Sequence, residues 1–176
     1  MGGGFIVPLH HYPFYFELFK QMEIITPALN VSEIRLRLCS NTKRKKMALR
    51  ISLKPHEKMI LGGAVIANGN NATCNLIIEN RVPILREKDI LSEEDADSPS
   101  RRLYFVIQLM YIDEEHLDLH QKKYWELVKE LVKAAPSTVG FIDQIGEYIL
   151  GGKYYQALKL ANNLIEYEQE VISRVQ

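Results

Sequence analysis

The chain contains little cysteine, no long apolar run and no net charge. Its two cysteines, Cys39 and Cys74, are too few for a disulfide framework or a zinc site, which favours reduced thiols in a reducing compartment. No apolar run reaches the roughly 18 residues that a membrane-spanning helix needs. The apolar residues 4–19 are interrupted by Pro and His, and no basic segment precedes them, as a secretory signal would require. We therefore expect a cytoplasmic globular protein with no membrane partner, built as one domain or as two small ones that share a core.

The sequence also lacks a convincing catalytic arrangement. His116 and His120 are four residues apart and could bind a metal together, but Leu117 stands where a zinc protease has its Glu. We interpret both as surface histidines. The carboxylates of residues 93–95 and 113–115 are contiguous, which is typical of helix starts or solvated loops rather than of an acid–base pair. No catalytic residue, metal site or cofactor is predicted, and we do not expect an enzyme.

The neutral total hides an uneven distribution of charge. Residues 1–46 carry 7 basic and 3 acidic side chains, residues 47–91 carry 6 and 4, and residues 92–176 carry 9 and 15, for net charges of +4, +2 and −6. A polyanion would be repelled by the last part and tolerated by the first two. If the protein binds RNA, we expect it to do so toward its N-terminal side.

Residues 1–46 look like an addition to the chain. They have no clean helical or strand periodicity, and they end in the basic residues 43–46 directly before Met47. Such a cluster can bind nucleic acid. It can also be a translated ribosome-binding site, because Lys and Arg codons can be purine-rich. We expect residues 1–46 to be a poorly structured extension from a mis-called start, with Met47 as the natural first residue; peptides from upstream of Met47 in the native protein would contradict this.

Residues 47–91 predict a compact region of five short strands. Residues 49–54 alternate between apolar and polar side chains, the pattern of a half-buried strand, and Pro55 ends this strand. Asn68-Gly69 predicts a hairpin turn, because both residues accept a positive φ. So small a unit should lean on the helices that follow, on a second copy, or on both. The other four strands are predicted at residues 58–61, 64–67, 73–79 and 82–85.

Residues 92–176 predict about four α-helices. Ser98-Pro99 is a helix start with Ser as N-cap, and residues 113–115 are expected to end this helix and to open the second one. Ser137 is expected to cap the third helix, and Gly151-Gly152 to separate it from the fourth, which gives a C-terminal helix hairpin. The predicted class is therefore α+β, with a small antiparallel five-stranded sheet or barrel-like unit followed by about four helices.

Five stretches of the sequence, taken in order, resemble the FlbT family of flagellar biosynthesis repressors. The similarity begins at Met47, which agrees with a mis-called start, and extends to about Glu168. The resemblance implies binding to the 5′ untranslated region of flagellin mRNA, with repression of translation or faster mRNA decay. The stretches are MALRISLKP (47–55), KMILGGAVI (58–66), VPILREKDI (82–90), APST (135–138) and GKYYQALK (152–159).

The strand region is also similar to the carbon storage regulator (CsrA) family of small mRNA-binding proteins. Glu57 and Gly62 fall in matching order, and Arg86 matches the RNA-contacting arginine at the end of the last strand. The chain departs from that family at Leu53, where a basic residue is usual, and at His56, which replaces a turn Gly. Because members of that family pair strands between subunits, the resemblance is compatible with a homodimer.

The two resemblances and the strand pattern meet on one set of polar residues. These side chains would form a cationic edge beside the last strand, where Arg can stack on an unpaired base or bridge phosphates and Lys can neutralise a phosphate. The alternative is that they are ordinary solvated residues, since alternating Lys and Arg also protect edge strands from aggregation. The predicted RNA-binding residues are Arg50, Ser52, Lys54, Arg86 and Lys88.

A second function stays open. The amphipathic helices and the acidic excess of residues 92–176 would suit an adaptor or chaperone for flagellin or another flagellar assembly partner, because an acidic face repels RNA but can hold a helix in a groove. The two functions can also coexist, with the strand region binding RNA and the helices binding a partner that releases it.

Overall fold

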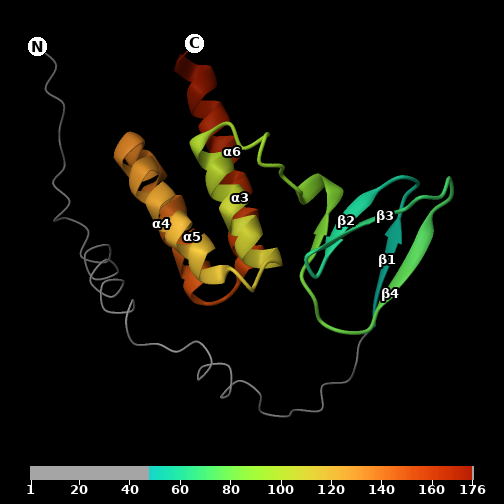
Figure 1. Cartoon of the computed structure of the whole chain (residues 1–176). Coiled ribbons are helices and arrows are strands. Elements are labelled where there is room, and N and C mark those ends of the chain that lie inside the picture. The colour runs from blue at the N-terminus through green and yellow to red at the C-terminus, as the bar shows by residue number, and fades with distance from the viewer. Residues whose placement is uncertain (1–47, 176) are drawn as a thin grey trace, which may run out of the picture. The chain divides into compact units, whose positions relative to one another are not determined.

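The computed structural model describes residues 48–175, in which five strands are followed by four α-helices (Figure 1). This confirms the predicted α+β class. The expectations for residues 1–46 and for Met47 lie outside the described residues. The strands are β1 (Leu49–Leu53), β2 (Lys58–Leu61), β3 (Ala64–Ala67), β4 (Cys74–Ile78) and β5 (Ile84–Arg86), and the helices are α3 (Pro99–Ile112), α4 (Leu117–Ala134), α5 (Val139–Leu150) and α6 (Tyr154–Val175).

The strands form two small antiparallel sheets around a shared core. β1 pairs with β4, and β2 lies between β3 and β5. The alternation read from the sequence places one face of β1 inward, so that Ile51 and Leu53 are buried together with Met59 of β2 and Ile78 of β4. β5 is an edge strand, and Pro83, which cannot donate to a strand partner, lies directly before it.

The hairpin turn lies at Gly62-Gly63, and the prediction of a hairpin at Asn68-Gly69 is wrong. Gly62 and Gly63 have φ values of 57° and 84° and join the paired strands β2 and β3. β3 and β4 do not pair with each other. Asn68 is instead buried, and its side-chain amide donates to the carbonyl of Lys54 at 2.9 Å. The buried Asn68 side chain therefore stabilises the loop that follows β1.

The start of α3 follows the prediction, whereas the start of α4 does not. The Ser98 side chain accepts a hydrogen bond from the backbone N–H of Arg101 at 3.3 Å, as an N-cap should. The acidic residues 113–115 lie in the connection between the helices, and α4 begins at Leu117 with His116 as N-cap. Asp113 is the C-cap of α3, and its carboxylate contacts two histidines of the next segment.

The C-terminal helix hairpin is confirmed, but Ser137 does not cap α5. Ser137 lies within a 3-10 turn (Pro136–Thr138), where the Thr138 hydroxyl donates to the carbonyl of Ala135 at 2.7 Å. At the other end of α5, Gly152 adopts a positive φ of 66° and lets the chain reverse into α6.

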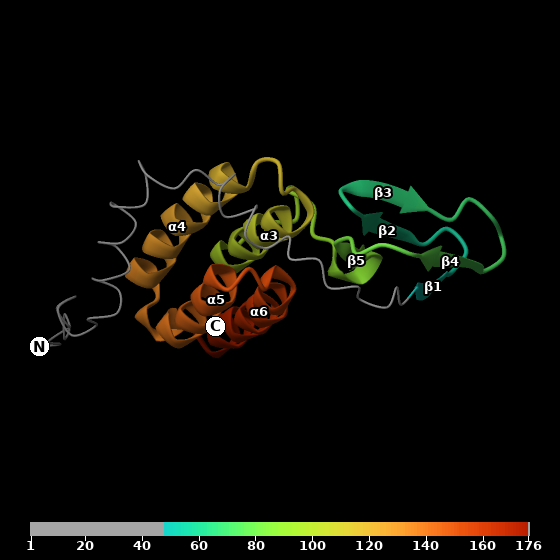
Figure 2. The same ribbon diagram turned by 90° about the horizontal axis from the view of Figure 1, so that it is seen from below.

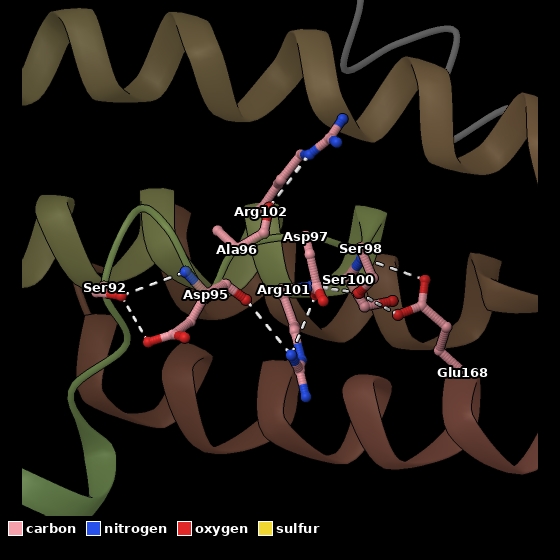
Figure 3. Close-up of polar contacts among 9 residues, drawn as sticks. All are labelled: Ser92, Asp95, Ala96, Asp97, Ser98, Ser100, Arg101, Arg102 and Glu168. Carbon is pink, nitrogen blue, oxygen red and sulfur yellow. Dashed lines mark hydrogen bonds and ion pairs between the residues drawn. The ribbon is translucent and has the colours of Figure 1, made fainter.

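α3 and α6 are the two inner helices of the bundle. α3 packs against α4 and α6, and α5 packs against α6 (Figure 2). Glu168 of α6 reaches the first turn of α3, where its carboxylate accepts from the Ser98 hydroxyl at 2.5 Å and from the Ser100 N–H at 3.4 Å (Figure 3). None of the helices in residues 48–175 is both long and apolar enough to cross a membrane.

α3 also fastens the strand region to the helices. The Tyr104 hydroxyl donates to the carbonyl of Asp89 at 2.7 Å, and the Tyr111 hydroxyl accepts from the N–H of Ile84 at 3.1 Å. The strands therefore lean on the helices, which is one of the alternatives expected, and residues 48–175 belong to one compact unit.

Candidate nucleic-acid interface

An open hollow of about 590 Å³ lies between the turn after β1 and the end of β5. Three of the five predicted RNA-binding residues, Lys54, Arg86 and Lys88, line it. They come from segments that are far apart in the sequence and that only the fold brings together. Pro55, His56, Glu57 and Glu87 complete the lining.

Arg86 is the fixed cation of this hollow. Its place is set by β5, where the neighbouring Leu85 is buried in the core. The Nη1 atom of Arg86 donates to the carbonyl oxygen of Ser52 at 3.0 Å and to Oε1 of Glu57 at 3.3 Å. The guanidinium is thus held through one nitrogen. It remains accessible to a ligand, because 39% of the Arg86 side chain is exposed.

Glu57 is held from two sides. Its Oε2 accepts from the backbone N–H of Lys54 at 2.8 Å, and its side chain is only 17% exposed. The Lys54 N–H lowers the pKa of Glu57, and Arg86 adds to this lowering against the opposing effect of desolvation. The carboxylate is therefore ionised at neutral pH and is part of the permanent charge pattern of the hollow.

The turn between β1 and β2 contains an unusual backbone conformation. His56 has a φ of 60°, in the left-handed region that favours glycine. Its N–H donates to the carbonyl of Asn68 at 3.0 Å, and its Nε2 lies 3.1 Å from Oδ1 of Asn71. Among residues 48–175, His56 is the one residue other than glycine with a positive φ.

Arg50 and Ser52 do not line the hollow. They lie on the exposed face of β1, where Arg50 is opposite Ile77 of β4 and the Ser52 hydroxyl donates to Oδ1 of Asn75 at 2.7 Å. Only the backbone of Ser52 reaches the hollow, through its carbonyl bond to Arg86. The predicted cationic edge is thus divided: two of its residues lie on the exposed face of β1, and the other three line the hollow.

The charge of the hollow suits an anion. Three cations stand against two carboxylates, and within residues 48–175 the ammonium groups of Lys54 and Lys88 have no ion-pair partner. Lys54 and Lys88 can therefore bind a phosphate without first breaking an internal ion pair. His56 and Glu57 were not predicted as part of this site; the Pro55 turn marked the place, but only the fold shows that it faces β5.

The second polar cluster is the connection between α3 and α4. Asp113 Oδ2 lies 3.0 Å from Nδ1 of His116 and 2.9 Å from Nε2 of His120. His116 is exposed, as predicted, whereas the His120 side chain is only 12% exposed, so its interpretation as a surface residue is wrong. The hydrogen bond from His120 is the main cause that lowers the pKa of Asp113. No group of three His, Cys, Asp or Glu residues in the described part of the chain is placed to hold a metal ion.

Comparison with known proteins gives one consistent match. The model of the family described as "Flagellar protein FlbT" matches residues 49–172. A "Probable flagellum biosynthesis repressor protein FlbT 1" of Bradyrhizobium diazoefficiens is 44% identical over 125 residues, which cover 71% of this chain and 85% of the relative. A "Probable flagellum biosynthesis repressor protein FlbT" of Rhodopseudomonas palustris is 40% identical over 128 residues, covering 73% of this chain and all of the relative.

More distant relatives agree. The "Flagellum biosynthesis repressor protein FlbT" of Caulobacter vibrioides is 35% identical over 131 residues, which cover 73% of this chain and 92% of the relative. No solved structure matches the chain significantly. The matched residues include both the strands around the hollow and the four helices.

Proposed function

Because this chain belongs to the FlbT family of flagellar proteins, we propose that it regulates flagellum biosynthesis in the cytoplasm by binding the 5′ untranslated region of flagellin mRNA. A regulatory role follows from the family, whose members compared above are named flagellum biosynthesis repressors. RNA as the ligand, and the outcome as blocked translation or faster decay, are our proposal.

The meeting of Lys54, Arg86 and Lys88 in one hollow carries the proposal. Arg86 is fixed, and the two lysines are free to neutralise phosphate. The hollow lies in the part of the chain whose net charge is positive, away from the acidic excess of residues 92–176. Single-stranded RNA is recognised through such combinations of phosphate contacts and accessible guanidinium groups. Arg50, on the exposed face of β1, would extend the path of the strand.

The test is RNA binding by the full chain across a salt series. The probe is a labelled leader RNA from the flagellin gene of the same genome, and the variants are Arg86→Glu and Arg81→Glu. Both variants change the net charge equally, but Arg81 is exposed and does not line the hollow. We expect Arg86→Glu to abolish salt-sensitive binding and Arg81→Glu to retain most of it. Equal binding by the two variants, or none by the parent chain, would contradict the proposal.

One observation favours the second function, an adaptor for flagellin or another assembly partner. α5 and α6 expose Leu150, Val171 and Ile172, which are 63%, 39% and 52% accessible. Apolar side chains on the outside of amphipathic helices can dock against a partner. If purified flagellin binds the chain and Arg86→Glu leaves this binding intact, the helices have a separate role. Sedimentation of the protein alone would test the homodimer with which the strand resemblance is compatible.

A further inference from the structure

The two carboxylates of the hollow differ in their contacts: Glu57 is bonded to Arg86, and Glu87 is not. Glu57 contacts Arg86 and the backbone of Lys54, whereas within residues 48–175 Glu87 makes no hydrogen bond or ion pair with Arg86. By charge alone, both carboxylates would oppose a phosphate equally. Their contacts, however, give them different roles.

The contacts of Arg86 are all made by one nitrogen. Nη1 bonds to the Ser52 carbonyl and to Glu57, so Nη2 and Nε have no hydrogen-bond partner within the described residues. A long arginine side chain normally loses rotamer freedom when it binds, and that loss weakens affinity. Here the side chain is already ordered before a ligand arrives, and two neighbouring donors remain for that ligand.

We infer that Glu57 is a positioning residue that holds the Arg86 guanidinium ready for a ligand group with two adjacent acceptors. This inference rests on the proposed RNA-binding function. A guanidinium donates two parallel bonds either to two phosphate oxygens or to O6 and N7 of a guanine. Both sources present the same pair of acceptors, and both occur in RNA.

The size and the construction of the site agree with this role. A hollow of about 590 Å³ is within the range of small-ligand sites and has room for one unstacked nucleotide. Lys54 and Lys88 flank Arg86 and can neutralise the adjoining phosphates. Glu57 is itself fixed by the N–H of Lys54, so the element that orients the arginine is anchored to the backbone and not to another mobile side chain.

The experiment compares Glu57→Gln with Glu87→Gln in the full chain. Each removes one negative charge from the same hollow, so simple electrostatics predicts slightly tighter RNA binding by both. Gln at position 57 can still accept from the Lys54 N–H, which preserves the turn, but the charged partner of Arg86 is lost. We expect Glu57→Gln to bind the flagellin leader RNA about threefold to tenfold more weakly, and Glu87→Gln to bind it unchanged or up to about twofold more tightly.

Two controls separate the interpretations. In an Arg86→Gln background, Glu57→Gln should no longer weaken binding, because there is no guanidinium to orient. Thermal unfolding of each variant shows whether the fold is intact. If the Glu57→Gln chain is unstable, Glu57→Asp takes its place. The shorter Asp side chain keeps the charge but cannot reach Arg86 in the same geometry, so this variant should also bind RNA more weakly.

A uridine homopolymer distinguishes the two sources of acceptors. If Glu57→Gln weakens binding to the homopolymer and to the leader equally, Arg86 contacts phosphate. If it weakens only the leader, Arg86 reads a guanine. If Glu57→Gln tightens binding as Glu87→Gln does, the inference is wrong although the RNA-binding function stands; if the parent chain binds neither RNA, the proposed function itself fails.

Discussion

Gln108 of α3 and Leu91 of the preceding segment exchange two hydrogen bonds, as neighbouring residues of two strands would. The Gln108 Nε2 donates to the carbonyl of Leu91 at 2.9 Å, and its Oε1 accepts from the Leu91 N–H at 2.8 Å. The amide is 3% exposed. The buried Gln108 side chain thus satisfies both the N–H and the C=O of Leu91, which lies between the strand region and the helices.

Replacing this amide should destabilise the fold. Gln108→Met keeps a similar volume but leaves the N–H and C=O of Leu91 without these partners. We expect the free energy of unfolding to fall by about 1–3 kcal/mol, as measured by urea denaturation. Gln156→Met on the exposed side of α6 is the matched control and should change it by less than about 0.5 kcal/mol.

The buried residues of β1 should be far more sensitive to truncation than its exposed first residue. Leu53 is fully buried, and Leu53→Ala should lower the free energy of unfolding by about 2–5 kcal/mol. Leu49 lies on the same strand but is 49% exposed, so Leu49→Ala should cost less than about 1 kcal/mol. Equal losses for the two variants would contradict the shared core of the two sheets.

The contribution of Ser98 as N-cap of α3 can be compared with that of Ser137, which was predicted to cap α5 but does not. Ser98→Ala removes the acceptor of the Arg101 N–H and the donor to Glu168. We expect a loss of about 1–2 kcal/mol by chemical denaturation. Ser137→Ala should stay within about 0.5 kcal/mol, because Ser137 is exposed and makes no capping bond.

The connection between α3 and α4 predicts a stability that depends on acid pH. The pKa of Asp113 is lowered in the folded protein, first by the hydrogen bond from His120. A depressed carboxyl pKa contributes stability that is present above the ordinary value of 3.8 and is lost as the pH falls through the lowered value. The difference in stability between the parent chain and Asp113→Asn should therefore shrink as the pH is lowered from about 5 to about 2. A difference that is independent of pH over this range would show that the carboxylate charge has no part in the connection.

The lysines of the hollow should affect the salt dependence of RNA binding rather than its sequence preference. Each of Lys54→Gln and Lys88→Gln should reduce the slope of log affinity against log salt by roughly 0.7, because one phosphate contact on a single strand is lost. Lys122→Gln, exposed on α4, serves as the control and should leave the slope unchanged. Slopes equal to that of the parent chain in both hollow variants would place the RNA elsewhere.

Features encoded locally could be predicted from the sequence. The alternation of β1, the N-cap Ser98 and the Gly turn between α5 and α6 each depend on a few neighbouring residues, and the structure has all three. Turn propensity, in contrast, shows only where a positive φ is tolerated. Asn68 does not form the predicted turn, because its buried side-chain amide donates to the carbonyl of Lys54 in the loop after β1. That contact depends on tertiary packing.

The candidate site was foreseen in its charges but not in its geometry. Arg86 and Glu57 are 29 residues apart, and nothing in either segment alone shows that β2 brings them into contact. The acidic residues 113–115 end α3 as predicted, but they do not open α4, because their electrostatic preference for a helix start competes with specific partners. Asp113 has such partners in His116 and His120.

The bonds from α3 to the strand region also determine when that region can be finished during synthesis. Tyr111, the last of the three α3 residues that hold it, is translated some 27 residues after Ile84, whose N–H it accepts. At about 5–20 residues per second, the nascent strands wait on the order of one to several seconds before these side chains have even been added. β5 is an edge strand, and during that interval its end lacks the helix that fixes it. We therefore expect the hollow, which Arg86 at the end of β5 lines, to be completed late on the ribosome, although all of its lining residues precede α3 in the chain.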